Sequence, residues 1–549
     1  MTKSLMTPAR RQKIHAEYAN LDRYSPESIL QYAKLLEGLT YRDLLDLDLP
    51  VNFELTPIND SPTDKGKLGK IVEERFFGIQ NNSRDEPDII ESGIEVKTTP
   101  SQWVKNTGKL KIDNGKDKRL QSKERLSLSM IPNDKPLADT LEDSHVFTKM
   151  NILLIQHIFE PDTNELDYEI ALVDYYTPSG TDLEIMQSDF DTIRTYVQSG
   201  RAHELSEGLT TYLGAATKSS SSKDRRTQYY PLQDEEGNYI LDAQGNQIRM
   251  ETKPRAFTFK QGFMKSLTSD GINKSYDSIL AKHELQKGQS FESLVLSLID
   301  QHKGKTANEI AIDLGLLQPT KAKNTLSNIV MAMLGVRQKH ATEFERSNTI
   351  VKTVRTYRDK KGELRMKEDF PLRVFKMLDI LHKNWEDSPW YELLSTHRFL
   401  IVVFNCQDSK GTEPRLQGAF FWSLPTELLG DPDDTSGKDT VYSYWKIIRS
   451  MLEAKTFRFT RKPVMRNGRP EITVQNNFPG STDHEFFHIR PGATLSAYRI
   501  SPEYSTDGLS IETGSEKDTD LLPDNQRIVK QKFWFSKHYI VKLIQEHNL

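Results

Sequence analysis

Hydrophobic residues recur at every third position near the start of the chain and alternate with polar residues further on. Within residues 1–60, the segment 25–49 places leucine or alanine at i, i+3, i+6 and i+9 from Leu30, which predicts an amphipathic helical region. Ser25 and Pro26 fit the cap and the first position of its helix. We therefore expect the chain to begin with helices.

The next segments predict one helix, several strands and then further helices. The run LGKIVEERFFG (68–78) has the pattern of a helix that ends at Gly78. Polar helical patterns occupy 187–208 and 277–340, and two Gly-Asn pairs predict a hairpin within 235–250. Short runs rich in apolar and β-branched residues predict strands at 93–99, 125–131 and 150–158.

The second half of the chain repeats the first half weakly and in the same order. Four pairs of segments match: 93–99 with 349–354, 145–156 with 396–404, 193–200 with 448–455, and 256–264 with 532–540. Ordered matches of this kind predict two copies of one structural unit. The expected fold is α/β, a mixed sheet flanked by helices and present twice, with domains at 1–270 and 336–549 and a helical connector at 271–335.

Composition narrows the class of protein. Hydrophobic residues make up 36% of the 549 residues and charged residues 28%, as in soluble globular proteins. No apolar run approaches the roughly 18 residues of a membrane span, and the first residues lack a signal-peptide core. Cys406 is the single cysteine, so we expect no internal disulfide and no cysteine-based zinc site. The expectation is a cytoplasmic protein without a membrane partner.

One group of carboxylates fits the chemistry of phosphodiester hydrolysis. Pro87-Asp88 is followed by Glu95-Val96-Lys97, and Glu95 and Lys97 share one face of a predicted strand because side chains alternate there. Two carboxylates suit Mg²⁺, which prefers oxygen ligands and lowers the pKa of a bound water. Lys97 would orient or deprotonate that water. The alternative is an exposed strand of alternating charge.

A third carboxylate lies on the predicted helix just upstream. Glu73 and Glu74 are adjacent there, and neighbouring helical positions point about 100° apart, so one of the two can face the site. The alternative for both is a solvated helix face.

Two segments are basic in a chain whose net charge is −4. Residues 105–125 contain eight lysines and arginines against three acids, and residues 217–228 contain four against one. Such segments suit DNA phosphates, and solvated lysine loops are the alternative.

A zinc-peptidase string also occurs, as His484-Glu485-Phe486-Phe487-His488. That motif needs a helix, because positions four apart must share a face. Its two aromatic residues and flanking turns predict a strand, on which such residues lie about 13 Å apart. We therefore disfavour a peptidase.

Several phrases carry a resemblance to a known family. KGKLGKIVEERFFG (65–78) with EPDIIESGIEVKTTP (86–100) resembles the MutH family of GATC-directed endonucleases. With SKERLSL, GRAHELSEGLTTYL and RAFTFK, the chain resembles still more closely the two-domain, Sau-type restriction endonucleases. The likeness covers nearly the whole chain, with 65–265 as the catalytic unit. It implies a restriction-endonuclease-like fold, Mg²⁺ as cofactor and double-stranded DNA containing GATC as partner.

The resemblance also implies roles for individual residues. The family's catalytic residues fall on Glu73 rather than Glu74, and on Asp88, Glu95, Lys97 and Lys149, with the three acids as metal ligands. From the pattern alone, Lys149 is an ordinary lysine at the start of a strand. The DNA-contacting candidates are Lys123, Arg125, Lys218, Arg225, Arg226, Arg255, Thr258 and Lys260. Mismatch-repair relatives have Arg-Pro-Lys in place of Ala216-Thr217-Lys218 and an aromatic residue in place of Thr258.

In the second half the acids are missing. The strand motif becomes Ile350-Val351-Lys352, and Ile329 stands where the helical glutamate would lie. A hydrocarbon side chain cannot bind Mg²⁺. Arg490 and the proline after it nevertheless match an Arg-Pro that the relatives use at DNA, so we expect a catalytically inactive effector site for DNA around Arg490.

These observations predict a Mg²⁺-dependent type II restriction endonuclease that cuts both strands at 5′-GATC-3′. A cognate DNA methyltransferase is the expected genetic partner, and a DNA-induced dimer is a further expectation. The alternatives are a MutH-like mismatch-repair nicking enzyme and, in another class, a non-catalytic GATC-binding regulator. The second copy argues against the first alternative, and the intact carboxylate set argues against the second.

Overall fold

The chain forms two compact units in the computed structural model. The structure describes residues 6–58, 66–80, 86–105, 118–218, 224–268, 276–316, 324–433, 437–466, 469–492 and 496–549. Unit 1 comprises 1–291 and 340–348, and unit 2 comprises 292–339 and 349–549. The chain therefore passes from one unit to the other three times.

Helices begin unit 1, as the sequence predicts. They are α1 (Pro8–Ala19), α2 (Pro26–Ala33), α3 (Tyr41–Leu45), α4 (Lys67–Ile71) and the π-helical turn η2 (Val72–Phe76). The side chains of Thr7, Ser25 and Thr40 accept hydrogen bonds from the first turns of α1, α2 and α3, and so satisfy N–H groups that no carbonyl of the helix can reach. Ser25 and Pro26 thus occupy the predicted cap and first position.

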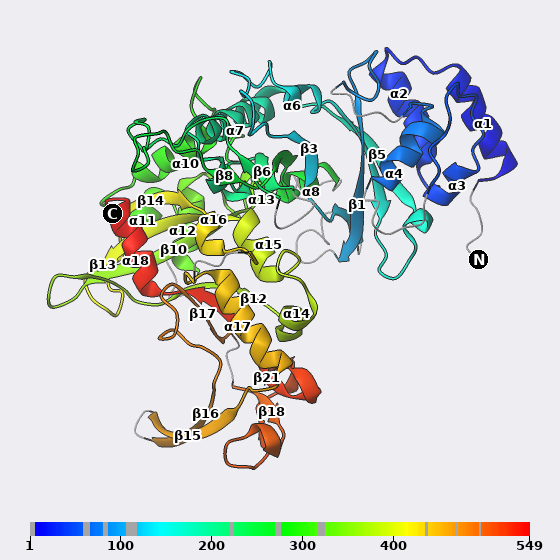
Figure 1. Ribbon diagram of the computed structural model, residues 1–549. Coiled ribbons are helices and arrows are strands. Elements are labelled where there is room, and N and C mark those ends of the chain that lie inside the picture. Colours follow the sequence, from blue (N-terminus) through cyan, green and yellow to red (C-terminus); the bar gives the residue numbers. More distant parts are fainter. Residues whose placement is uncertain are drawn as a thin grey trace. The chain divides into compact units, whose positions relative to one another are not determined.

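The first sheet of unit 1 carries the predicted acid and lysine strand. Its order is β2 (Lys118–Ser122), β1 (Glu95–Lys105), β4 (Ile152–Ile158) and β5 (Ile170–Tyr176). β1 and β4 are parallel, and the other two pairs are antiparallel. Val96, Leu153 and Ile155 share one hydrophobic core with the N-terminal helices, which lie together beside this sheet (Figure 1).

A second sheet of unit 1 is wholly antiparallel, in the order β3 (Leu126–Met130), β9 (Arg255–Phe259), β6 (Leu213–Thr217). The remaining elements are the helices α6 (His145–Thr148), α7 (Gly180–Gln198) and α8 (Gln261–Thr268), the pair β7 (Arg226–Thr227) and β8 (Glu251–Thr252), and the single turns η1 (Lys34–Leu36), η3 (Glu165–Asp167), η4 (Ala202–Glu204) and η5 (Glu207–Leu209).

The segment 340–348 returns to unit 1 and contains α13 (Thr342–Arg346). Both terminal nitrogens of Arg346 donate hydrogen bonds to the carboxylate of Asp182, each at 2.8 Å. Gly262 permits this approach, because a β-carbon there would lie 2.1 Å from the carbonyl oxygen of Glu345. A bidentate ion pair and a close backbone contact therefore hold α13 within unit 1.

Unit 2 contains two sheets and most of the remaining helices. One sheet has the order β11 (Leu364–Met366), β10 (Thr349–Arg358), β13 (Arg398–Cys406), β14 (Arg415–Trp422), and the other has the order β12 (Phe370–Val374), β22 (Gln531–Phe535), β17 (Phe487–Pro491). The helices are α10 (Phe291–Asp300), α11 (Ala307–Asp313), α12 (Thr325–Met333), α14 (Met377–His382), α15 (Pro389–Thr396), α16 (Thr426–Leu429), α17 (Val441–Glu453) and α18 (Lys537–Glu546).

The two sheets of unit 2 match those of unit 1 in strand order and direction. β10 is parallel to β13 and antiparallel to β11, just as β1 is parallel to β4 and antiparallel to β2. β22 lies between two antiparallel neighbours, as β9 does. The four matched pairs of segments fall on β1 and β10, β4 and β13, α7 and α17, and β9–α8 and β22–α18.

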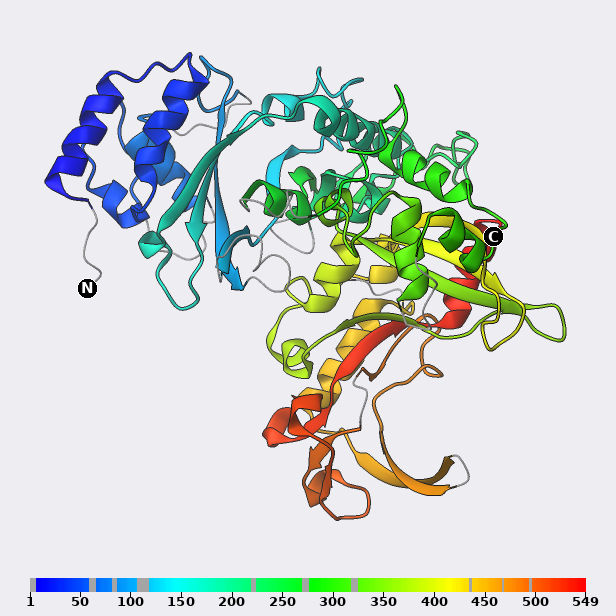
Figure 2. The same ribbon diagram turned by 180° about the vertical axis from the view of Figure 1, so that it is seen from behind.

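Unit 2 also has elements without a counterpart in the described part of unit 1. They are the ribbon of β15 (Phe459–Arg466) and β16 (Arg469–Asn476), the sheet β19 (Ile511–Thr513), β18 (Tyr498–Ile500), β21 (Arg527–Val529), β20 (Thr519–Leu521), and the turns η6 (Pro502–Tyr504), η7 (Glu516–Asp518) and η8 (Pro523–Asn525). Both are visible in orange at one end of unit 2 in Figure 2.

The units divide the expected connector 271–335 between them. Within unit 2, the N–H groups of Gly304 and Ala307 donate to the carbonyls of Leu416 and Pro414, at 2.9 and 2.8 Å. These bonds join the helical segment 292–339 to the edge of β14, within unit 2. No helix in the described ranges is both long and apolar enough to cross a membrane.

Candidate active site

Glu95 lies between two lysines at the start of β1. Its Oε1 accepts a hydrogen bond from Lys97 Nζ at 2.6 Å, and its Oε2 accepts one from Lys149 Nζ at 2.8 Å. The side chains of Glu95 and Lys149 are 6% and 8% exposed, whereas that of Lys97 is 23% exposed. A carboxylate that is removed from water requires such partners, and Lys97 is the one that solvent can reach.

The sheet explains how Lys149 reaches this position. It ends α6, directly before β4, and β4 runs parallel to β1 with Glu95 opposite Ile152. Parallel strands bring their beginnings to the same edge, so a residue just before β4 meets the first residue of β1. Lys149 Nζ also donates to the carbonyl of Glu86 at 2.5 Å, which ties the loop before β1 to the site.

Asp88 approaches the same strand from that loop. Ile89 and Ile94 form an antiparallel bridge that folds the loop back on itself, and Asp88 Oδ2 accepts a hydrogen bond from the N–H of Val96 at 2.8 Å. Burial, and then the negative charge of Glu95, raise the pKa of Asp88 above its usual value near 3.8. Two neighbouring carboxylates thus repel each other here.

The two adjacent glutamates of η2 have different environments. The N–H of Phe77 donates to the carbonyl of Val72 at 3.0 Å, five residues back, which is the π pattern. Glu74 is buried and accepts hydrogen bonds from the N–H and the hydroxyl of Thr56, at 2.8 and 2.6 Å. Glu74 is therefore a structural residue, and Glu73 is the more exposed of the pair.

Glu73 lies beside the opposite face of β1. A β-carbon on Gly69 would lie 3.5 Å from Glu73 Oε1 and 3.8 Å from Thr98 Oγ1, so both side chains border the same glycine. Thr98 alternates with Lys97 and faces away from it. The structure thus brings Asp88, Glu95, Lys97 and Lys149 together, and Glu73 as a member of this site stays a prediction. Over the ranges described above, no three acidic or histidine side chains converge as a metal site.

The donor set nevertheless fits Mg²⁺. Asp88 and Glu95 offer hard oxygen atoms, and their mutual repulsion, visible in the raised pKa of Asp88, is the kind that a cation relieves. Mg²⁺ in nucleotide and nucleic-acid enzymes commonly uses one or two carboxylates and completes its shell with water and phosphate oxygen.

Some predicted DNA contacts are exposed and some are not. Lys218, Arg225 and Arg226 are exposed, and Lys123 and Arg125 are 33% and 39% exposed. Four further members of the basic segments, Lys109, Lys111, Lys116 and Lys223, lie outside the described residues.

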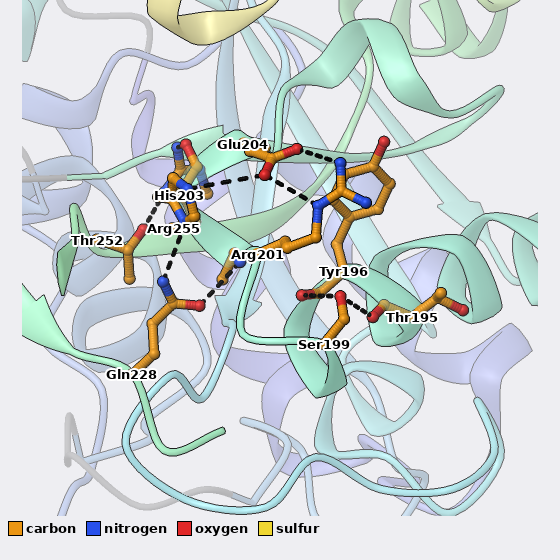
Figure 3. A network of polar contacts seen from close by, with 10 residues as sticks. Thr195, Tyr196, Ser199, Arg201, His203, Glu204, Gln228, Thr252 and Arg255 are labelled. Carbon is orange, nitrogen blue, oxygen red and sulfur yellow. Dashed lines mark hydrogen bonds and ion pairs between the residues drawn. The ribbon is translucent and has the colours of Figure 1, made fainter. Parts of the chain in front are cut away.

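Arg255, by contrast, is buried within a network that Figure 3 shows. Its Nε and one terminal nitrogen donate to the carbonyls of Leu205 and His203 at 3.0 and 2.8 Å, and its other terminal nitrogen donates to Thr252 Oγ1. Thr252 lies on β8, which pairs with Arg226 on β7. Arg255 therefore supports the strand pair that carries Arg226, and does not itself face solvent.

Thr258 and Lys260 are also inside unit 1, because β9 is the central strand of its sheet. Both side chains are fully buried. Thr258 donates its hydroxyl to Glu207 Oε1 at 3.2 Å, and Lys260 Nζ donates to the carbonyl of Thr210. Arg255, Thr258 and Lys260 are therefore all buried, and their contact with DNA stays a prediction.

Two buried acids in this region had no role in the sequence-based prediction. Glu207 also forms an ion pair with Arg125, at 3.2 Å. Asp189 accepts hydrogen bonds from three backbone N–H groups, each within 2.8 Å, those of Thr211, Tyr212 and Leu213. The phrase HELSEGLTTYL, part of the resemblance, was a signal for the first acid. No sequence signal marked Asp189.

The corresponding strand of unit 2 lacks the acids, as predicted. Ile350 and Lys352 lie on β10 opposite Phe399 and Ile401 of β13. Arg490 on β17 is half exposed, and its Nη1 lies 2.6 Å from Asp369 Oδ2.

The zinc-peptidase string is not helical, which confirms the geometric objection to it. His484 precedes β17 and His488 lies on it. Both are buried, and burial lowers the pKa of each imidazole.

Comparison with known families matches residues 77–189 to the family described as DNA mismatch repair enzyme MutH. That range contains Asp88, Glu95, Lys97 and Lys149, the four residues that the structure brings together. Residues 77–189 of this chain are therefore similar to the MutH family. Residues before 77, including the helix with the two glutamates, lie outside the match.

Two relatives align with different lengths of this chain. Over 492 residues the chain is 27% identical to the type II restriction enzyme Sau3AI of Staphylococcus aureus, an alignment that covers 86% of this chain and 91% of that enzyme. Over 204 residues it is 25% identical to the DNA mismatch repair protein MutH of Actinobacillus pleuropneumoniae, with 36% of this chain and 80% of that protein covered. The first alignment is longer than unit 1 and so extends into unit 2. The expected relationship to site-specific deoxyribonucleases is confirmed.

Proposed function

We propose that the protein is a type II restriction endonuclease that hydrolyses both strands of DNA at 5′-GATC-3′ with Mg²⁺. The observation that supports this most directly is the position of Glu95, held between Lys97 and Lys149 and beside Asp88, all within the range similar to the MutH family. Acids that share a site with a solvent-reachable lysine are what phosphodiester hydrolysis requires.

Each residue has a distinct part in this proposal. Asp88 and Glu95 hold Mg²⁺, with Glu73 as a third ligand supplied from η2. A bound Mg²⁺ would supply a water of lowered pKa and offset charge on the phosphate. Lys97, the more exposed lysine, orients the attacking water. Lys149 stabilises the charge that develops at the scissile phosphate.

The DNA-facing part of the proposal rests on the exposed cations of unit 1. Lys123, Arg125, Lys218, Arg225 and Arg226 contact the duplex backbone. Contacts of this kind give affinity that falls with salt and carry little sequence information. The specificity for GATC is proposed from the relatives and not from these residues.

Unit 2 is proposed to be a degenerate copy of unit 1 that binds a second GATC as an effector. Two sheets with the same strand order and direction support a duplication. Ile350 in place of Glu95 leaves this copy without its metal ligand. Arg490 remains half exposed on β17, where a duplex can reach it.

A plasmid with a single GATC site tests the proposal. With Mg²⁺ we expect full-length linear DNA, and we expect no cleavage in EDTA or when the site is changed to GTTC. A mismatch-repair nickase would stop at open circles, and a regulator would bind the plasmid without cutting it. Either result would contradict a restriction endonuclease. Protection of the same plasmid by a methyltransferase that modifies GATC would identify the genetic partner.

A further inference from the structure

Lys352 of unit 2 occupies the position of the solvent-reachable lysine of unit 1 but has no acid beside it. It lies two residues after Ile350 on β10, as Lys97 lies two residues after Glu95 on β1. Its Nζ donates to the carbonyl of Pro371 and lies 5.2 Å from the ring centroid of Phe370. Among the residues that the structure describes, no carboxylate forms an ion pair with it.

Two further cations lie near Lys352. Pro371, which accepts its hydrogen bond, is two residues before Arg373 on β12, and Val374 of the same strand pairs with Lys532 on β22. Burial, followed by the positive charges of Lys532 on β22 and Arg373 on β12, lowers the pKa of Lys352 to about 8. Arg373 is exposed and donates to His397 Nε2 at 3.2 Å, and Lys532 is partly buried. Neither of them has a carboxylate partner within the described ranges. The strands β10, β12 and β22 therefore each contribute one positive side chain to the same region of unit 2.

Asp369, the acid directly before β12, is paired with other groups. Asp369 is within 2.6 Å of Arg490 Nη1 and 3.7 Å of His488 Nε2, and it accepts a hydrogen bond from the N–H of Lys537 at 3.0 Å. Arg490 in turn covers the ring of Trp534 at 4.9 Å. The charge of Asp369 is thus engaged by Arg490 and His488, and Arg490 lies opposite Lys532 across β17 and β22.

A cluster of partly buried cations without a counter-charge is unfavourable, because burial removes the water that would screen the repulsion. An anion at the same place relieves it. In unit 1 the equivalent lysine is neutralised by Glu95. In unit 2 hydrocarbon replaces that acid, and the lysine remains.

We propose that Lys352, Arg373 and Lys532 form an anion site that holds one phosphate of a DNA backbone, so that unit 2 binds DNA without a divalent metal. This inference rests on the proposed function, in which unit 2 binds a second duplex. It adds the chemistry of that site: ammonium and guanidinium groups take the part that Mg²⁺ has in unit 1, and a phosphate is held but not hydrolysed.

The test uses the full chain with a short GATC duplex in EDTA. The number of duplexes bound per chain is measured by analytical ultracentrifugation, and the salt dependence of binding by fluorescence anisotropy. The variants are Lys352→Met, Lys532→Met and Arg373→Gln. Lys542→Met, which removes a charge from exposed α18, is the matched control. Arg373 is exposed, so its variant is expected to fold even if a change at Lys352 disturbs β10.

We expect two duplexes per wild-type chain in EDTA, and loss or at least tenfold weakening of one of them in the three variants. The slope of log K against log salt for that duplex should fall by about 1 for each phosphate contact removed. Wild-type stoichiometry of two with unchanged second-site affinity and slope in all three variants would overturn the anion site and leave the proposed function intact. A wild-type stoichiometry of one would overturn the anion site and the proposed second duplex on unit 2, whereas cleavage by unit 1 is tested separately with the single-site plasmid.

Discussion

At the scale of single residues, the site of unit 1 depends on one carboxylate with two positive partners of different exposure. Lys149 is nearly inaccessible, and Lys97 is open to solvent. Glu95 therefore has a structural partner and a partner available for chemistry. The loss of Lys149 and the loss of Lys97 therefore have different consequences, because a buried charge that loses its partner is far more unfavourable than an exposed one.

Replacement of Lys97 or Glu95 by alanine should abolish cleavage while GATC binding in Ca²⁺ persists. Lys97→Ala removes the group that orients water, and Glu95→Ala removes a metal ligand. We expect rates at least a thousand times lower, measured as single-turnover cleavage of a GATC duplex, on the order of the effect of losing one preorganised electrostatic group. Lys542→Ala, at an exposed lysine of α18, is the control. Near wild-type cleavage by either alanine variant would show that the site lies elsewhere.

Asp88→Asn should stabilise the metal-free protein. The folded pKa of Asp88 is raised, so its ionisation opposes folding: the contribution is favourable below the unfolded value near 3.8 and is lost as pH rises through the folded value. Asparagine can still accept the hydrogen bond from Val96 but carries no charge. In EDTA, urea unfolding should show the variant more stable than wild type at pH 7, with the difference shrinking as pH falls toward 4. A variant that is less stable at pH 7 would contradict the repulsion argument.

At the scale of elements, η2 decides which of two adjacent glutamates is structural. The wide turn directs Glu74 to Thr56, inside the unit, and leaves Glu73 beside Gly69 and Thr98. The family resemblance had assigned the catalytic role to the first of the pair, and the burial of the second is consistent with that assignment.

The two glutamates provide a matched pair of variants. Glu74→Ala leaves the N–H and hydroxyl of Thr56 without their acceptor, which costs about 1–3 kcal/mol of unfolding free energy. Glu73→Ala should leave stability within about 0.5 kcal/mol and lower cleavage at fixed Mg²⁺. Urea denaturation and cleavage rates separate the two effects. The reverse outcome, an inactive but stable Glu74 variant, would exchange their roles.

Much of the architecture could be predicted from sequence, because strands and helices have strong periodic signals. The strand of Glu95, the cap at Ser25 and the non-helical context of His484 are confirmed. The burial of Arg255, Thr258 and Lys260 was not predicted, because a run such as RAFTFK looks the same on a central strand as on an edge. Lys149 required the resemblance, since its contact with Glu95 depends on a parallel pairing that no local pattern indicates.

At the scale of the whole molecule, the chain contains two equivalent sheet pairs with different chemistry. One retains acids at the start of its parallel pair, and the other retains only a lysine there. Since both belong to one chain, a unit with these acids and a unit without them are always present in equal number.

DNA with two GATC sites should therefore be cut faster than DNA with one. If unit 2 favours the cutting-competent state when it holds a second duplex, a coupling of about 1–3 kcal/mol gives roughly a 5- to 150-fold acceleration. Arg490→Ala should remove the acceleration and preserve the single-site rate, while Lys542→Ala should change neither. Initial rates on one-site and two-site plasmids provide the measurement. Equal rates on both plasmids over a range of enzyme concentrations would leave unit 2 as a clamp or a dimer surface.

The return of residues 340–348 to unit 1 imposes an order on events during synthesis. When residue 291 has been made, unit 1 still lacks α13 and therefore Arg346, the partner of Asp182. The ribosome must first produce α10, α11 and α12, which belong to unit 2. Unit 1 thus cannot fold completely before part of unit 2 has been synthesised. Unit 1 can therefore complete its folding only after these three helices of unit 2 have been synthesised.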